Sequence, residues 1–151
     1  MVQNAEAFTG GILASADDPR ITRVGKVLRN THLDELPQLF NILKGDMSLV
    51  GPRPERPMFV EKYKATVDQY EQRFLVRAGL TGTAQVYGHY HTDISEKTAY
   101  DLWYIEHFSL RQDIKLIALT VKVLLEGRPL QTAPEKPAHP SSKLSNPRIV
   151  K

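Results

Sequence analysis

Two adjacent acidic residues, Asp34 and Glu35, are the strongest candidates for chemistry in this sequence. A carboxylate can attack a phosphoryl group when the negative charges around the phosphorus are neutralised. A hard cation such as Mg²⁺, held by one or two carboxylates and by substrate phosphates, neutralises them. Arg29 precedes Asp34 by five residues, and its guanidinium fork matches phosphate oxygens. The cluster therefore predicts metal-assisted phosphoryl chemistry, although an isolated Asp-Glu pair is more often an ordinary helix start.

Two further segments carry residues suited to a phosphorylated substrate. Arg53 stands between Pro52 and Pro54, which stiffen the backbone and lower the entropic cost of orienting a phosphate contact. Gln85 follows the small residues 81–84, which allow close backbone approach, and its amide can read a base edge or a sugar hydroxyl. The alternative interpretation is a plain exposed turn for the first segment and a plain hairpin turn for the second.

Helical periodicity predicts the elements that must position these residues. Helices are expected over 20–30, 33–44, 55–70, 95–107 and 109–127. The first two would place Arg29 at the end of one helix and the acidic pair at the start of the next. Asp17 or Asp18 is the expected cap of the first helix, and Thr31 that of the second.

Three other signals complete the expected organisation. Gly45 is suited to end the second helix, and Ser109 with Gln112 resembles a capping box that opens the last one. Short strands over 74–76 and 83–87 are predicted to form a hairpin around the intervening Gly-Leu-Thr-Gly turn.

The predicted fold is α+β and mostly helical. Residues 17–128 are expected to form a small globular core of about five helices with a short β-hairpin. Residues 1–16 are interpreted as a flexible lead-in. From 129 to 151 prolines recur with Ser and Lys while apolar residues become rare, which predicts a disordered Pro-rich C-terminal tail.

Composition narrows the classes of function. A chain of 151 residues with 41% hydrophobic and 25% charged residues is ordinary for one globular domain. The net charge of +3, without aromatic residues among the basic ones, argues against a nucleic-acid partner. Zero cysteines exclude disulfides and zinc–thiolate sites. No apolar run reaches the roughly 18 residues of a spanning helix, although the basic face of 20–29 suits either water or anionic headgroups.

Several motifs together resemble the bacterial sugar transferase family, the monotopic polyprenyl-phosphate phosphoglycosyl transferases. The similar segments are Asp18–Arg29, Leu33–Pro54, Ala78–Val86, Tyr100–Ile105 and Phe108–Asp113. They include the acidic pair and the Gly-Pro-Arg-Pro turn, and together they extend over about residues 17–126. Their joint occurrence is highly specific.

The resemblance implies Mg²⁺-dependent transfer of a sugar-1-phosphate from a UDP-sugar to undecaprenyl phosphate, which initiates exopolysaccharide, O-antigen or glycoconjugate synthesis. By this resemblance Asp34 attacks the β-phosphate and forms an aspartyl phosphosugar intermediate. Glu35 helps to hold the metal, and Asp34 is the second candidate metal ligand. Arg29 and Arg53 become phosphate-binding residues, and Gln85 lies on the nucleotide side. No residue pattern in the sequence indicates which sugar of the UDP-sugar donor would be recognised, so the identity of the sugar is not predicted.

The family begins with a re-entrant membrane helix and a basic segment, and residues 1–16 resemble neither. We therefore expect a truncated, soluble portion of a protein that works at the cytoplasmic face of the bacterial inner membrane. The alternative function is a catalytically incomplete fragment that binds nucleotide-sugar or the membrane surface without turnover.

Overall fold

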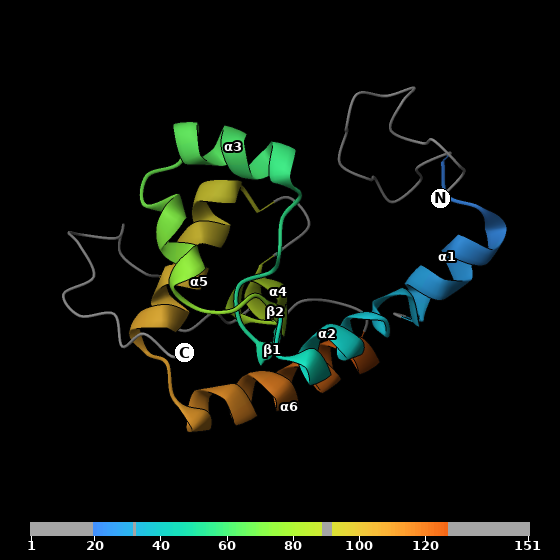
Figure 1. The fold of residues 1–151 in the computed structure, drawn as a ribbon. Coiled ribbons are helices and arrows are strands. Elements are labelled where there is room, and N and C mark those ends of the chain that lie inside the picture. The colour runs from blue at the N-terminus through green and yellow to red at the C-terminus, as the bar shows by residue number, and fades with distance from the viewer. Residues whose placement is uncertain (1–19, 32, 89–91, 127–151) are drawn as a thin grey trace. The chain divides into compact units, whose positions relative to one another are not determined.

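The computed structural model describes residues 20–31, 33–88 and 92–126 (Figure 1). The predictions of a flexible lead-in and of a disordered tail concern residues outside these ranges. The chain divides into two compact units between Phe40 and Asn41.

The first unit contains the helix α1 (Arg23–Asn30) and the 3₁₀ helix η1 (Leu33–Glu35). Thr22 caps α1, because its hydroxyl oxygen accepts a hydrogen bond from the Gly25 N–H at 3.1 Å. Helix α1 therefore starts at Arg23 rather than at the predicted Arg20, and the candidate caps Asp17 and Asp18 lie outside the described residues.

Thr31 closes α1 instead of opening the next helix. Its hydroxyl donates to the carbonyl oxygens of Val27 and Leu28, at 2.9 and 3.1 Å. The prediction of Thr31 as an N-cap is therefore wrong, since the side chain satisfies carbonyls left without partners at the end of α1.

The predicted continuous helix over 33–44 is also wrong. Helix η1 stops at Glu35, and α2 (Gln38–Lys44) begins only after Pro37. Proline lacks an N–H and its ring disfavours the helical conformation at the preceding residue, so the chain turns at Pro37 before the helix resumes.

The predicted end of α2 at Gly45 is confirmed. Gly45 adopts φ +84°, the left-handed conformation that glycine reaches without steric cost. The Gly45 N–H bonds to the Ile42 carbonyl at 3.0 Å, and the Asp46 N–H bonds to the Asn41 carbonyl at 2.9 Å. These two bonds form a Schellman motif, which reverses the chain toward the first strand.

The second unit contains a parallel pair of strands, not the predicted hairpin. β1 (Ser48–Val50) pairs with β2 (Gly79–Thr81), with Ser48 opposite Gly79 and Val50 opposite Thr81. The segment predicted as a turn is thus itself a strand. Parallel pairing requires a long crossover, which α3 (Pro57–Thr66) and the 3₁₀ helix η2 (Tyr70–Leu75) supply.

Glycines explain this pairing. A Cβ atom on Gly79 would lie 2.1 Å from the Gly51 backbone nitrogen, so only glycine permits the approach. The two predicted hairpin strands are helical instead: residues 74–75 belong to η2, and 83–87 form the short helix α4 (Thr83–Tyr87).

The remaining helices lie close to their predicted positions. α5 (Ile94–Glu106) is capped by Asp93, and α6 (Leu110–Glu126) by Ser109, whose hydroxyl oxygen accepts from the Gln112 N–H. α3 begins at Pro57, a residue favoured in the first helical turn, and ends before the predicted Tyr70. The mostly helical α+β class is confirmed, with six α-helices in the described residues against about five predicted.

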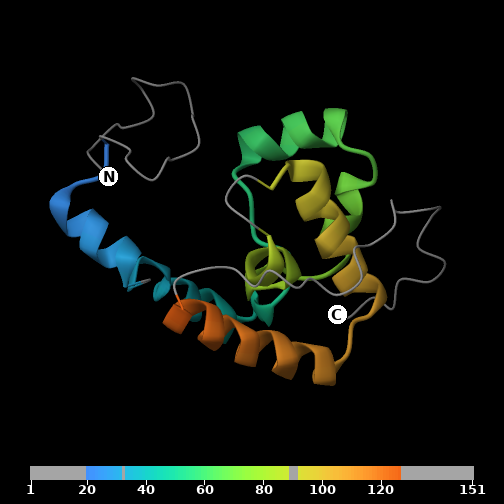
Figure 2. The ribbon, with the colours of Figure 1, turned by 180° about the vertical axis from the view of Figure 1, so that it is seen from behind.

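The core of the second unit joins the strands to three helices. Val50, Val86, Tyr87, Tyr100, Tyr104 and Leu116 form its buried apolar cluster. α6 lies along one side of the strand pair and α3 lies at the far end of the unit (Figures 1 and 2). Across the described residues, every helix is too short or too polar to cross a membrane.

Gly79→Ala is expected to destabilise the second unit by about 3 kcal/mol, the upper part of the usual range for overpacking. The added Cβ meets the Gly51 N and Cα at 2.1 and 2.6 Å, and backbone atoms cannot move without parting the strands. Urea unfolding followed by fluorescence of the single tryptophan, Trp103 in α5, measures the loss.

Gly45→Ala is the matched control. Among the described residues its Cβ would meet only the Arg77 side chain, at 3.9 Å, so the loss comes from φ +84° and should be about 1 kcal/mol. Equal losses in the two variants would contradict the close-approach explanation.

Candidate active site

The acidic pair and Arg29 lie in the first unit. Asp34 and Glu35 belong to η1, and Arg29 lies in the last turn of α1. Asp34 is exposed, whereas Glu35 and Arg29 are partly buried. Adjacent residues in a 3₁₀ helix point about 120° apart, so the two carboxylates diverge and can meet different groups. Because η1 has only three residues, its macrodipole contributes little at the pair, and the Asp34 side chain is open to solvent.

The two carboxylates suit a Mg²⁺ ion that takes only some of its ligands from the protein. Both side chains offer hard carboxylate oxygens, the ligand type that Mg²⁺ prefers. Among the residues that the structure describes, no group of three or more His, Cys, Asp or Glu side chains could hold a metal ion. A magnesium ion bound here would complete its coordination shell with water and substrate phosphate oxygens, which is the common arrangement in phosphoryl-transfer sites.

Arg53 and Gln85 both follow the carboxyl ends of the parallel strands of the second unit. Arg53 follows the carboxyl end of β1 and Gln85 follows that of β2. Because the strands are parallel, these ends meet at one edge, where ligands of α/β sheets commonly bind. Gly51 and Gly82 make the contact there, since a Cβ on Gly82 would lie 2.3 Å from the Gly51 carbonyl oxygen.

The Gln85 amide has no hydrogen-bond partner among the residues that the structure describes. Its Nε2 and Oε1 atoms are both buried and make no hydrogen bond within the described part of the chain, and neither does the Thr83 hydroxyl. An unpaired buried polar group costs about 1–3 kcal/mol. Such groups call for an explanation, and a ligand that supplies the missing partners is one. A substrate contact through Gln85 stays a prediction, since Gln38, Gln72 and Gln112 also carry buried atoms of this kind.

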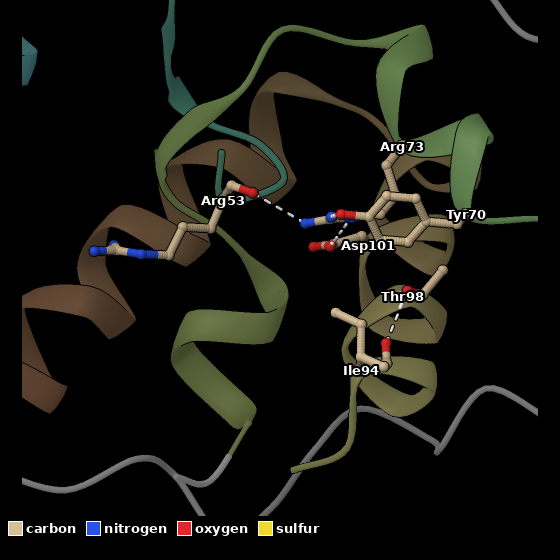
Figure 3. Close-up of polar contacts among 6 residues, drawn as sticks. All are labelled: Arg53, Tyr70, Arg73, Ile94, Thr98 and Asp101. Carbon is tan, nitrogen blue, oxygen red and sulfur yellow. Dashed lines mark hydrogen bonds and ion pairs between the residues drawn. The ribbon is translucent and has the colours of Figure 1, made fainter. Parts of the chain in front are cut away.

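A second arginine, Arg73, forms a hydrogen bond to the Arg53 backbone. Arg73 Nη2 donates to the Arg53 carbonyl oxygen at 3.0 Å, while the Arg53 side chain is exposed and extends away from that contact (Figure 3). Arg73 itself is buried: its Nε donates to Asp101 Oδ2 at 2.7 Å, and its Nη1 donates to the Tyr70 hydroxyl at 2.8 Å.

Sequence reasoning did not single out Arg73 or Asp101. A signal existed, because Thr98, Asp101 and Tyr104 recur at helical spacing along α5 and all three are buried, which places a charge on the packed face. Burial raises the pKa of the Asp101 carboxyl to about 6, although the neighbouring Arg73 guanidinium lowers it. A buried carboxylate of this kind needs a cationic partner, and the structure supplies Arg73.

A cavity of about 400 Å³ lies elsewhere in the second unit, between β1 and the start of α6. Its walls are mostly apolar and include Val50, Phe108 and Ile114. The Asp113 carboxylate also lines it and accepts a hydrogen bond from the Tyr104 hydroxyl at 2.7 Å. Arg77 lines the cavity as well, but none of the predicted site residues does, so we do not assign it to the candidate site.

Comparison with known proteins identifies the family to which the sequence is similar. The family model described as bacterial sugar transferase matches residues 1–127. A UDP-N-acetylgalactosamine-undecaprenyl-phosphate N-acetylgalactosaminephosphotransferase of Aeromonas hydrophila is 45% identical over 84% of this chain and 30% of its own length. The undecaprenyl-phosphate galactose phosphotransferase of Salmonella typhimurium is 48% identical over 72% of this chain and 22% of its own length.

A third relative, the UDP-glucose:undecaprenyl-phosphate glucose-1-phosphate transferase of Caulobacter vibrioides, is 46% identical over 74% of this chain and 44% of its own length. The chain thus spans between 22% and 44% of the length of these three relatives.

The Asp101 carboxyl is expected to titrate with a midpoint of about 6, which ¹³C NMR of its carboxyl carbon measures directly. Since this folded-state pKa is raised above the unfolded value, the contribution of Asp101 to stability is full below about pH 4 and is lost as the pH rises through about 6. The difference between the urea midpoints of the wild type and Asp101→Asn should therefore decrease as the pH rises from about 4 through about 6. A carboxyl midpoint below 4 would contradict the prediction.

Proposed function

Because this chain belongs to the bacterial sugar transferase family, we propose that it carries the site for transfer of a sugar-1-phosphate from a UDP-sugar to undecaprenyl phosphate. The observation that carries the proposal is the family match over residues 1–127, which include the exposed Asp34 carboxylate. All three relatives are named for transfer involving undecaprenyl phosphate, and two of the names include a UDP-sugar.

In the proposed reaction Asp34 is the nucleophile. An Asp34 carboxylate oxygen forms a bond to the β-phosphorus, and the bond from that phosphorus to the bridging oxygen breaks, so UMP leaves with the electron pair. An oxygen of undecaprenyl phosphate then attacks the same phosphorus and releases the carboxylate. The attacking groups are both anions, so neither step needs a base. The exposure of Asp34 supports this role, since a phosphate must reach it.

The other predicted residues are assigned to binding. Glu35 and Asp34 would hold Mg²⁺, which when bound neutralises phosphate charge. Arg29 and Arg53 offer guanidinium forks to the phosphates. Gln85, whose buried amide has no partner in the described chain, would bond the nucleotide or a sugar hydroxyl. We propose that the reaction takes place at the cytoplasmic face of the bacterial inner membrane, where the lipid acceptor would be held.

Incubation with Mg²⁺ and a panel of UDP-sugars is expected to give a protein adduct with the mass of one phosphosugar, together with free UMP. Asp34→Asn removes the nucleophile, so the adduct should vanish and UMP release should fall by roughly 10⁴-fold or more. Intact-mass spectrometry and chromatography of the nucleotides measure both products.

Asp68→Asn is the matched control, since Asp68 is an exposed aspartate of the other unit. It should leave both products unchanged. Binding of UDP-sugars without adduct or UMP would refute turnover by this chain and favour the alternative function, a binding fragment. An adduct that persists in Asp34→Asn would refute the assignment of the nucleophile.

A further inference from the structure

The loop from β1 to α3 carries Arg53 without regular secondary structure of its own. Residues 52–56 are neither helix nor strand. The start of the loop is fixed, because the Pro52 carbonyl accepts from the Gly79 N–H at 2.9 Å and the Gly51 N–H donates to the Thr81 carbonyl at 2.8 Å. Beyond Pro52 the contact from Arg73 Nη2 to the Arg53 carbonyl reaches the loop from the core.

Three hydrogen bonds fix the Arg73 guanidinium in one plane. Nε donates to Asp101 on α5, Nη1 donates to Tyr70 at the start of η2, and Nη2 donates to the Arg53 carbonyl (Figure 3). A guanidinium is planar and rigid, so two bonds within the core determine where its third donor points. The position of that donor is therefore set by α5 and η2, and not by the loop.

Stability alone does not require this arrangement. Arg73 and Asp101 are 5% and 1% exposed, and a buried ion pair can often be replaced by apolar side chains of similar volume without loss of stability. Apolar side chains could pack η2 against α5, but they could not donate a hydrogen bond to the Arg53 carbonyl. The pair thus performs one task that apolar packing cannot.

We propose that Arg73 and Asp101 are positioning residues for Arg53: the buried pair holds the Arg53 backbone so that its side chain faces a phosphate group of the nucleotide-sugar. This inference rests on the proposed phosphate-binding role of Arg53. In this proposal Arg73 fixes the loop through the Arg53 carbonyl, and Asp101 fixes the orientation of Arg73. Neither residue is proposed to contact the substrate.

The test compares two ways of removing the contact. Arg73→Met combined with Asp101→Leu deletes both buried charges together, and Arg73→Lys keeps the charge beside Asp101 but lacks the planar fork. In both variants we expect ¹⁵N heteronuclear NOEs to fall at the Arg53, Glu55 and Arg56 amides while those of α6 stay unchanged. We also expect the affinity for UDP with Mg²⁺, measured by calorimetry, to fall about tenfold. If the double variant does not fold, Arg73→Lys decides.

Tyr70→Phe is the matched control, because it removes a hydrogen bond from the same guanidinium but leaves the donor to Arg53 in place. Its urea midpoint should fall, while the loop NOEs and the UDP affinity should stay within twofold of wild type. A purely structural role of Arg73 would instead make the loop and the affinity follow stability in all variants, and that result would overturn the proposal.

Arg53→Ala separates this inference from the proposed function. If Arg73 acts through Arg53, Arg73→Lys should weaken UDP binding no further in the Arg53→Ala background. Unchanged loop NOEs in the Arg73 variants would overturn positioning even if Arg53→Ala weakens UDP binding. A mobilised loop with unchanged UDP affinity in Arg53→Ala would confirm that the pair holds the loop and would refute phosphate binding by Arg53.

Discussion

The backbone of Gly51 lies against the backbone of Gly79 and Gly82 more closely than any side chain would allow. This contact lets two three-residue strands pair in parallel, and it draws the loop that bears Arg53 and the helix that bears Gln85 to a single edge. So short a sheet has little stability of its own. α6 and α4 pack against it, and the Thr81 and Thr120 hydroxyls lie 2.6 Å apart between β2 and α6. The geometry of this edge follows from glycine at three positions and from the helices that hold the strands together.

Local signals were sufficient where an element is stabilised by its own neighbours. Periodicity predicted α5, and periodicity with the Ser109–Gln112 pair predicted α6, almost to their ends. In the structure Asp93 and Ser109 bond to amides within the first turn of these helices. Pro37 divided the predicted second helix, a break that its missing N–H and the restriction on Leu36 explain. The hairpin was wrong for a different reason. A glycine that makes a turn and a glycine that admits a distant backbone look alike in the sequence, and only the pairing with β1 separates the two.

The candidate site likewise contains residues that the sequence reveals and contacts that form only in the folded chain. The predictions for Asp34, Glu35, Arg29 and Arg53 rest on chemical groups that are visible in the sequence. The support beneath Arg53 could not, since it joins residues from η2 and α5 through a backbone carbonyl that has no sequence signature. Asp101 was visible only as a charge on an apolar helical face, and such a charge indicates a buried partner without saying which residue it is.

The proposed reaction also bears on the role of the buried Asp101 carboxyl. Titratable groups with shifted pKa values often mark catalytic acids and bases. In the second unit, however, the carboxyl whose pKa burial raises to about 6 is Asp101, which is 1% exposed and bonded to Arg73. Attack by a carboxylate and then by a phosphate on one phosphorus transfers no proton, so the chemistry itself needs no group tuned to neutral pH. It needs an accessible nucleophile, neutralised phosphate charge and cations held in place. A buried ion pair beneath an exposed arginine serves the last of these requirements, and the perturbed pKa of Asp101 is the consequence of building a rigid support from charged residues in the core.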